Sequence, residues 1–184
     1  MNNSALKILY LFNGIFVFAA AMLAPLYAIY AEELEATIFQ ISLLAFVFLS
    51  SKVLFTFLVK KFGDEVLEKE YLLLIGFAFR AFAWILLIFV SSVLPLFLIQ
   101  ILLGIGEAFG NPSFNAIFAE HLDKGKHIKE YAEWGIIDSI SAAVGTLIGG
   151  AIVTVFGFNI LFITMSFFAI VAFIGVYLQP RSLL

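Results

Sequence analysis

The chain has 184 residues, of which 64% are hydrophobic and 12% charged, with no cysteine and a mean hydropathy of +1.12. A soluble domain is nearer half apolar and about a quarter charged, so this composition excludes a soluble globular protein and a disordered tail. Without cysteine there is no thiol nucleophile, thiolate metal site or disulfide framework. Because a spanning helix with its connection uses about 30 residues, the length predicts about six membrane spans.

Six apolar stretches follow one another, each separated from the next by charged or turn-forming residues. Long runs with few internal charges predict helices, because barrel strands would be shorter and alternating. The first run exceeds the about 7–15 apolar residues of a signal peptide, so we expect it to remain as a span. We therefore predict an all-α membrane protein in lipid, with one domain over 1–184 and spans over 7–30, 37–59, 71–90, 94–118, 131–155 and 158–178.

The charges outside these spans lie asymmetrically. On one predicted side of the membrane the charged residues are Glu32, Glu33 and Glu35. All Lys and Arg residues outside the spans lie on the other side. Cytoplasmic loops collect Lys and Arg, so both termini and the charged loops 60–70 and 120–130 are predicted to face the cytoplasm. The protein is then a multi-pass component of the cell membrane. The eight basic residues are Lys7, Lys60, Lys61, Lys69, Lys124, Lys126, Lys129 and Arg181.

A short segment recurs about half a chain later. Residues 28–34 read AIYAEEL and residues 116–122 read AIFAEHL, with five of seven positions identical and an offset of 88 residues. Pro25 and Pro112 precede the two copies at nearly the same distance. A three-helix unit repeated once inserts upside down, so the pattern predicts two inverted repeats, about 1–91 and 92–184. Chance similarity between two Ala-rich segments is the alternative interpretation.

Four ionisable residues fall inside the predicted spans, where charge is costly and indicates function by default. Arg80 and Glu107 lie near the middle of their spans, and Lys52 and Asp138 lie nearer the cytoplasmic side. One interpretation pairs Arg80 with Glu107 in a structural salt bridge. The other makes Glu107 a proton or cation site influenced by Arg80. For Asp138 there are two interpretations, an ion pair with Lys52 or a role in coupling. Lys52 itself could instead extend to the cytoplasmic surface.

The fourth predicted span has a polar stripe. Its members recur at steps of three or four residues and share one helical face, which favours a cavity lining over hydrogen bonds to neighbouring helices. The first span adds Asn13 and Tyr27 to the candidate pathway, and in the fifth span Gly145, Gly149 and Gly150 are expected to serve helix packing. The sixth span, without a charge, is expected to face lipid. The stripe consists of Gln100, Gly104, Glu107, Asn111 and Asn115.

Several local patterns resemble one half of a Major Facilitator Superfamily transporter. The segment KKFGDEVLEK over 60–69 lies where that family carries G-x-x-x-D-R-x-G-R-K, and only Asp64 and Lys69 match. GIG at 104–106 and GTLIGG at 145–150 resemble the fourth-span and fifth-span signatures, with Gln100 and Thr146 in place of the usual Arg and Pro. Members usually have twelve spans, so the chain also resembles the six-span proteins of this family.

The resemblance implies a secondary transporter rather than an enzyme, with no cofactor and with Asp64 and Lys69 in a gating loop. Two six-helix halves face each other in the full-length fold, so we expect a parallel homodimer that moves an unidentified small solute through a central cavity. Proton coupling through Glu107 is part of this hypothesis. One alternative is a non-transporting scaffold, which would not need the stripe around Glu107. Another is a subunit that pairs with a different six-span half.

This chain lacks the residues that several other classes of membrane protein require. An intramembrane protease needs a Ser–His pair or two aspartates within spans, but His121 and His127 fall in a loop and Asp138 is the one intramembrane Asp. An aquaporin-like channel needs two NPA motifs, and this chain offers only NPS at 111–113 and APL at 24–26. A mitochondrial-type carrier would show three P-x-[DE]-x-x-[KR] motifs. The few basic residues are interleaved with acids, so no nucleic-acid partner is expected.

Overall fold

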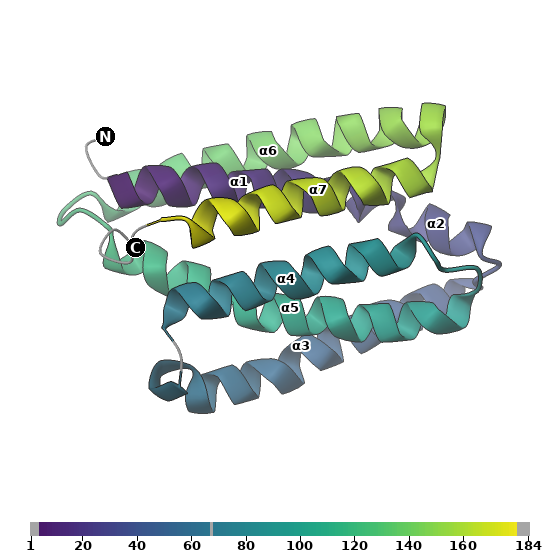
Figure 1. Cartoon of the computed structure of the whole chain (residues 1–184), viewed down its shortest axis with the longest axis horizontal. Coiled ribbons are helices and arrows are strands. Elements are labelled where there is room, and N and C mark those ends of the chain that lie inside the picture. Colours follow the sequence, from purple (N-terminus) through teal and green to yellow (C-terminus); the bar gives the residue numbers. More distant parts are fainter. Residues whose placement is uncertain (1–3, 67, 180–184) are drawn as a thin grey trace.

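The computed structural model describes residues 4–66 and 68–179, and the side chains of 64–66 lie outside the described part. All regular structure in this part is helical, and six helices are long and apolar enough to cross a membrane, with α1, η1 and α2 together forming the first (Figure 1). The predicted all-α, six-span architecture is therefore confirmed. The elements are α1 (Ser4–Leu23), η1 (Ala24–Leu26), α2 (Tyr27–Glu33), α3 (Ile38–Val66), α4 (Lys69–Leu87), α5 (Val93–Glu120), α6 (His127–Phe156) and α7 (Phe158–Tyr177).

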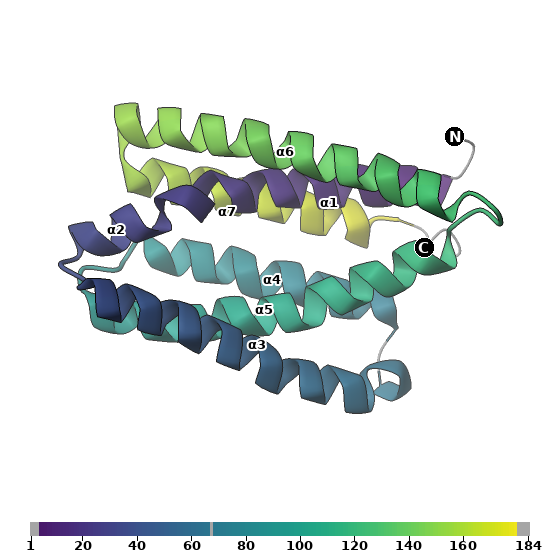
Figure 2. The same ribbon diagram turned by 180° about the vertical axis from the view of Figure 1, so that it is seen from behind.

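The helices form two layers. Seen from behind in Figure 2, α6, α1, α5 and α3 make one layer, and α4 and α7 pack against α1 and α5 from the other side. Within the first layer, α1 packs along α6 and α5 packs along α3, whereas α1 and α5 touch only briefly. The packing has an internal symmetry: if α1 is exchanged with α5, α3 with α6 and α4 with α7, the same pairs of spans are in contact.

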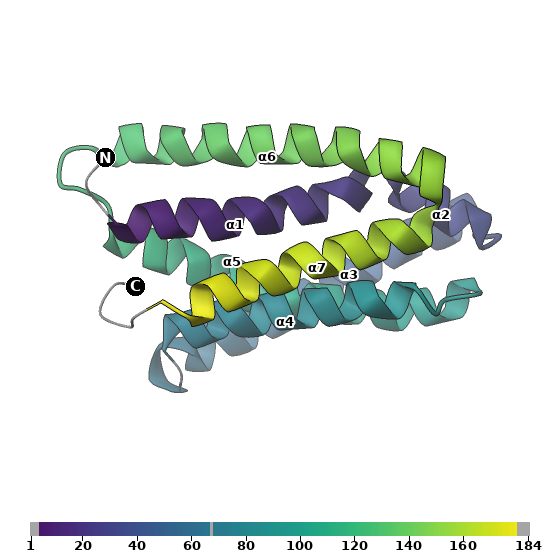
Figure 3. The ribbon, with the colours of Figure 1, turned by 45° about the horizontal axis from the view of Figure 1, so that its top comes forward.

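The two ends of the bundle differ in what they contain. Ser4, Gln179 and the α3–α4 and α5–α6 connections lie at one end, which we call the terminus end (Figures 1 and 3). The α2–α3, α4–α5 and α6–α7 connections lie at the opposite end. The prediction that 60–70 is a loop is wrong, because α3 continues to Val66 and α4 begins at Lys69. Lys and Glu are good helix formers, so a helix does not have to stop where it leaves the membrane.

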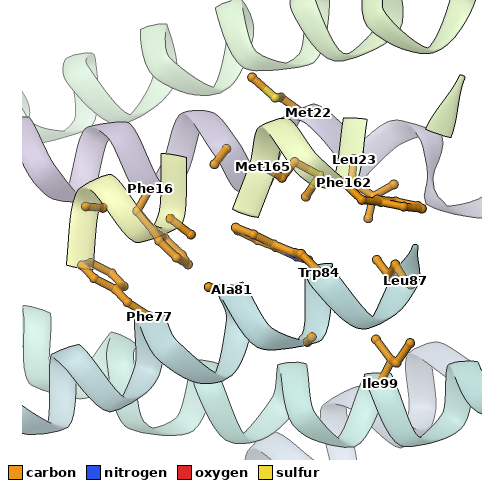
Figure 4. Packing of buried hydrophobic residues seen from close by; sticks show 14 of the residues in the cluster. Phe16, Met22, Leu23, Phe77, Ala81, Trp84, Leu87, Ile99, Phe162 and Met165 are labelled. Carbon is orange, nitrogen blue, oxygen red and sulfur yellow. The ribbon is translucent and has the colours of Figure 1, made fainter. Parts of the chain in front are cut away.

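The core lies between the two layers and combines aromatic rings with Leu, Ile, Met and Ala side chains (Figure 4). Phe16 of α1 stacks on Phe77 of α4 with ring centroids 4.4 Å apart, and on Trp84 at 5.4 Å. Phe162 and Met165 of α7 are fully buried in the same cluster. The expectation that the sixth span simply faces lipid is therefore wrong, because α7 buries a full face against α1 and α4. A helix that is apolar all round gives no contrast from which its packed face could be predicted.

Glycines bring α6 and α1 close together. A Cβ on Gly145 or on Gly149 would collide with the backbone of α1, at Phe18 and Met22 respectively. The prediction that Gly150 serves the same packing is wrong, because a Cβ on Gly150 would meet nothing within 4 Å. The next residue along a helix lies about 100° around the axis, so Gly150 leaves the contact that Gly149 makes.

Candidate functional site

A cleft runs along the bundle between α1 and α5, floored by α4 and, toward the opposite end, by α7. It holds two cavities that share Arg80 and Glu107 in their linings. The terminus-end cavity, of about 220 Å³, combines apolar and aromatic lining residues with the polar side chains of Asn13, Arg80, Glu107, Asn111, Asn115 and Asp138. The opposite-end cavity, of about 380 Å³, is mostly apolar and has Tyr27 and Gln100 as its neutral polar groups.

Arg80 enters the cleft from α4 and lies where the two cavities meet. Its Nη2 is 2.9 Å from Oε2 of Glu107, and its Cζ lies 4.6 Å from the centroid of the Phe16 ring on α1. The side chains of Arg80 and Glu107 are 15% and 22% exposed, so water reaches both only partly. An aromatic face and a carboxylate both stabilise a guanidinium that has left bulk water. The predicted contact between Arg80 and Glu107 is thus present, and it divides the cleft.

Glu107 holds more than one partner. Lys52 of α3 and the amide of Asn111 both approach its Oε1, each at 3.3 Å, and Asn115 donates in turn to Oδ1 of Asn111 at 3.2 Å. The suggested pair of Lys52 with Asp138 is therefore wrong, and so is the suggestion that Lys52 reaches the cytoplasmic surface. The reason is the packing of α3 against α5, a long-range contact that spacing along the chain does not reveal.

The other predicted pathway residues divide between the two cavities. Asn13 of α1 and Asp138 of α6 line the terminus-end cavity. The hydroxyl of Tyr27 is buried near Gln100, without a hydrogen bond of ordinary geometry. Gly104 does not line the cleft, because a Cβ there would collide with α3 at Phe48 and Ser51. Helix α5 thus uses Gly104 to approach α3.

Of the two predicted gating-loop residues, Lys69 lies at the start of α4 and lines neither cavity of the cleft. The side chain of Asp64 is outside the described part of the chain. Lys69 forms an ion pair with Glu120, which joins the start of α4 to the end of α5.

Sequence reasoning missed Lys52 as a partner of Glu107 and missed Phe16 as the ring under Arg80. The spacing of Phe77, Arg80 and Trp84 places them on one face of α4, which was a usable signal for aromatic surroundings. Among the described residues, no group of three His, Asp or Glu is arranged to hold a metal ion.

Comparison with known proteins agrees with this architecture. The sequence profile of the Major Facilitator Superfamily matches residues 9–183. An uncharacterized MFS-type transporter of Methanocaldococcus jannaschii is 28% identical over 164 residues, which are 88% of this chain and 42% of that relative. The chain thus spans less than half the length of this curated relative. With its six apolar helices it is an integral multi-pass membrane protein, and it belongs to the Major Facilitator Superfamily of transporters.

Proposed function

We propose that this chain is one six-helix half of a secondary transporter, and that two parallel copies move a small solute through a cavity between them. The observation that carries the proposal is the Arg80–Glu107 pair, which lies between two cavities of one cleft. Ionisable groups in the middle of a membrane protein mark solute or ion pathways. A cavity on each side of such a pair is what a site reached alternately from the two ends requires.

The cleft needs a cover on the side away from α4 and α7. Asn111 and Asn115 are exposed there, and Glu107 is partly exposed. If these three side chains faced lipid, each would lose polar partners. The loss would cost about 0.6 kcal/mol or more of stabilisation for each interaction. A second copy facing the first encloses both clefts in one water-filled space. Two-fold pairing is also the commonest closed symmetry among homo-oligomers.

The helices beside the cleft suit such a contact. A two-fold axis in front of the cleft would place α3 of one copy beside α6 of the other. Both helices leave large apolar side chains exposed, among them Leu49 and Val144. Next to the cleft, α6 also presents a stripe of small residues that favours close helix approach. The stripe consists of Gly135, Ser139, Ala142, Thr146 and Gly150, and a Cβ on either glycine would meet nothing within 4 Å.

Charge supports the parallel arrangement and its orientation. The described basic residues outside the spans lie toward the terminus end, whereas the α2–α3, α4–α5 and α6–α7 connections have none. We infer that the terminus end is cytoplasmic and that the protein resides in the cell membrane. An antiparallel partner would place its basic residues outside. The proposal of two inverted repeats is supported by the symmetric pattern of helix contacts described above. It is also supported by the similar sequences at which α2 ends, at Glu33, and α5 ends, at Glu120.

Glu107 is the proposed coupling group, since its carboxylate is shared by Arg80 and Lys52 and its side chain is 22% exposed. The alternative is a half that pairs with a different six-span chain, or a scaffold that transports nothing.

Disulfide crosslinking in membranes tests the homodimer. Leu49 lies 11 residues from the start of α3 and Thr146 lies 10 residues from the end of α6, so both lie at similar depth from the opposite end. Chains carrying Leu49→Cys and chains carrying Thr146→Cys, separately tagged and expressed together, should form a mixed disulfide. Neither chain expressed alone should form one.

The matched control uses Phe82→Cys and Phe167→Cys, at positions 53% and 60% exposed on the outer face of α4 and α7. This pair should not crosslink. A missing Leu49–Thr146 disulfide, or an equally efficient control, would refute the homodimer. Co-purification with a different six-span chain would establish the alternative.

A further inference from the structure

Glu107, which lines both cavities, has two cations in direct contact. One carboxylate, Glu107, is shared by Arg80 at 2.9 Å and Lys52 at 3.3 Å. The exposed fractions of the Arg80 and Lys52 side chains are 15% and 36%. These three side chains together carry one net positive charge at a depth where uncompensated charge is costly. An anionic group of a solute can take the place of this one carboxylate beside the two cations.

The opposite-end cavity indicates what the rest of that anion looks like. Arg80 and Glu107 supply the charged part of its lining, and Tyr27 and Gln100 supply one hydroxyl and one amide. Most of the other lining side chains are large and apolar, so a second charged group on the solute would lie there without a partner. The large apolar residues are Leu23, Phe48, Trp84, Leu103 and Met165.

We propose that the solute is a small amphipathic monocarboxylate, and that Glu107 is the internal counter-ion which the solute carboxylate replaces on Arg80 and Lys52. This assignment rests on the proposed transport through the cleft. When the monoanion arrives, Glu107 takes up one proton and releases the two cations to the solute. The net charge of Arg80, Lys52, Glu107 and the bound solute is then one positive charge, the same as the net charge of the three side chains before binding. The exchange therefore adds no uncompensated charge to the membrane interior.

The surroundings of Glu107 on each neighbouring helix favour this exchange over cation binding. Arg80 on α4 and Lys52 on α3 are the charged groups in contact with it, and Asn111 on its own helix is neutral. On α6, Asp138 lines only the terminus-end cavity. On α2, Tyr27 lines only the opposite-end cavity. A solute ammonium placed at Glu107 would therefore lie beside two fixed cations.

Binding to the purified full chain in lipid nanodiscs tests the solute class without requiring transport. Isothermal titration calorimetry would compare benzoate, phenylacetate and C4–C8 aliphatic acids with the amides and primary amines of the same skeletons. We expect acids to bind at least tenfold more tightly than their amides and amines. Titrations in two buffers of different ionisation enthalpy should show that one proton is taken up with each acid bound.

Three variants separate the counter-ion role from a merely structural one. Glu107→Gln should bind acids at least as tightly as the unmodified chain, because a neutral amide does not compete for the two cations, and the proton uptake should be lost. Lys52→Met should weaken acid binding at least tenfold. Lys60→Met, an exposed position farther along α3, should change nothing. If Glu107→Gln fails to fold, the Lys52→Met result and the ranking of acids against amides and amines decide.

Tighter binding of amines or amides, binding of no acid in the panel, or loss of acid binding in a folded Glu107→Gln variant would each overturn the proposal. The homodimer is judged separately by the Leu49–Thr146 disulfide, which involves no ligand. A crosslinked dimer that binds amines would therefore retain the proposed function and refute only the monocarboxylate.

Discussion

Helix α1 has two very different neighbours in the same layer. It meets α6 backbone to backbone at Gly145 and Gly149, where a single Cβ would collide with Phe18 or Met22. It meets α5 across the cleft, where polar side chains and two cavities separate the helices. The first contact depends on glycines, which have no side chain, and the second on paired charged side chains. We therefore expect the first to be sensitive to added volume and the second to altered charge.

The contact between α4 and α5 joins these two modes. Gly76 lies against Gly110, so the two backbones approach closely. A Cβ on Gly106 would lie 2.6 Å from Cγ of Arg80, and one on Gly110 would lie 3.0 Å from its Nη2. The glycines of α5 thus leave the space through which Arg80 reaches Glu107. Close packing here positions the charge in the cleft.

The largest expected effect comes from adding volume to the α1–α6 contact. Gly149→Leu should destabilise the fold by about 3 kcal/mol, because the new side chain has to push α6 away from the Met22 backbone. Thermal unfolding followed by the monodisperse fraction in detergent measures the loss. Gly150→Leu is the matched control at the adjacent residue, and with both variants measured as detergent-separated monomers its midpoint should stay near that of the unmodified chain. Equal loss in both variants would contradict the asymmetry.

A smaller effect is expected from altering charge in the cleft. Arg80→Gln and Glu107→Gln should each lower stability, and the double variant should lose less than the sum of the two. The interaction free energy should be about 0.5–3 kcal/mol, as for residues in direct contact. Denaturant unfolding of the four chains in one detergent gives this value. Strict additivity would mean that the ion pair contributes nothing to the fold.

The smallest effect concerns the repeated segment. Tyr30 and Phe118 occupy equivalent positions 88 residues apart, and both rings are buried. Only Tyr30 adds a hydroxyl, which donates to the Leu87 carbonyl at 3.0 Å. Tyr30→Phe should therefore cost about 0.6 kcal/mol, a typical value for one hydrogen bond in a membrane protein. Tyr177→Phe, at a 62% exposed ring, is the control in the same unfolding assay.

How much the sequence predicted depends on whether a feature is local. The six spans and the Arg80–Glu107 contact followed from apolar length and from the cost of unpaired charge, which are written in consecutive residues. The partner of Lys52 did not follow, because it depends on which helix lies beside α3. Gly149 and Gly150 look alike in the sequence, and only the direction of α1 distinguishes them. The packed face of α7 was hidden for a similar reason, since all its faces are apolar.

The most direct test of the central claim is the water accessibility of the two cavities. The cysteine-free chain allows Asn115→Cys in the terminus-end cavity and Ala24→Cys in the opposite-end cavity. Phe167→Cys and Ile174→Cys, at exposed positions on the outer face of α7, report on lipid. Membrane-impermeant maleimide, applied to sealed vesicles from either side, should label Asn115→Cys and Ala24→Cys from opposite sides and leave the α7 positions unlabelled. Cleft cysteines that react no faster than the α7 cysteines would mean a dry cleft, and would contradict a solute path past Arg80 and Glu107.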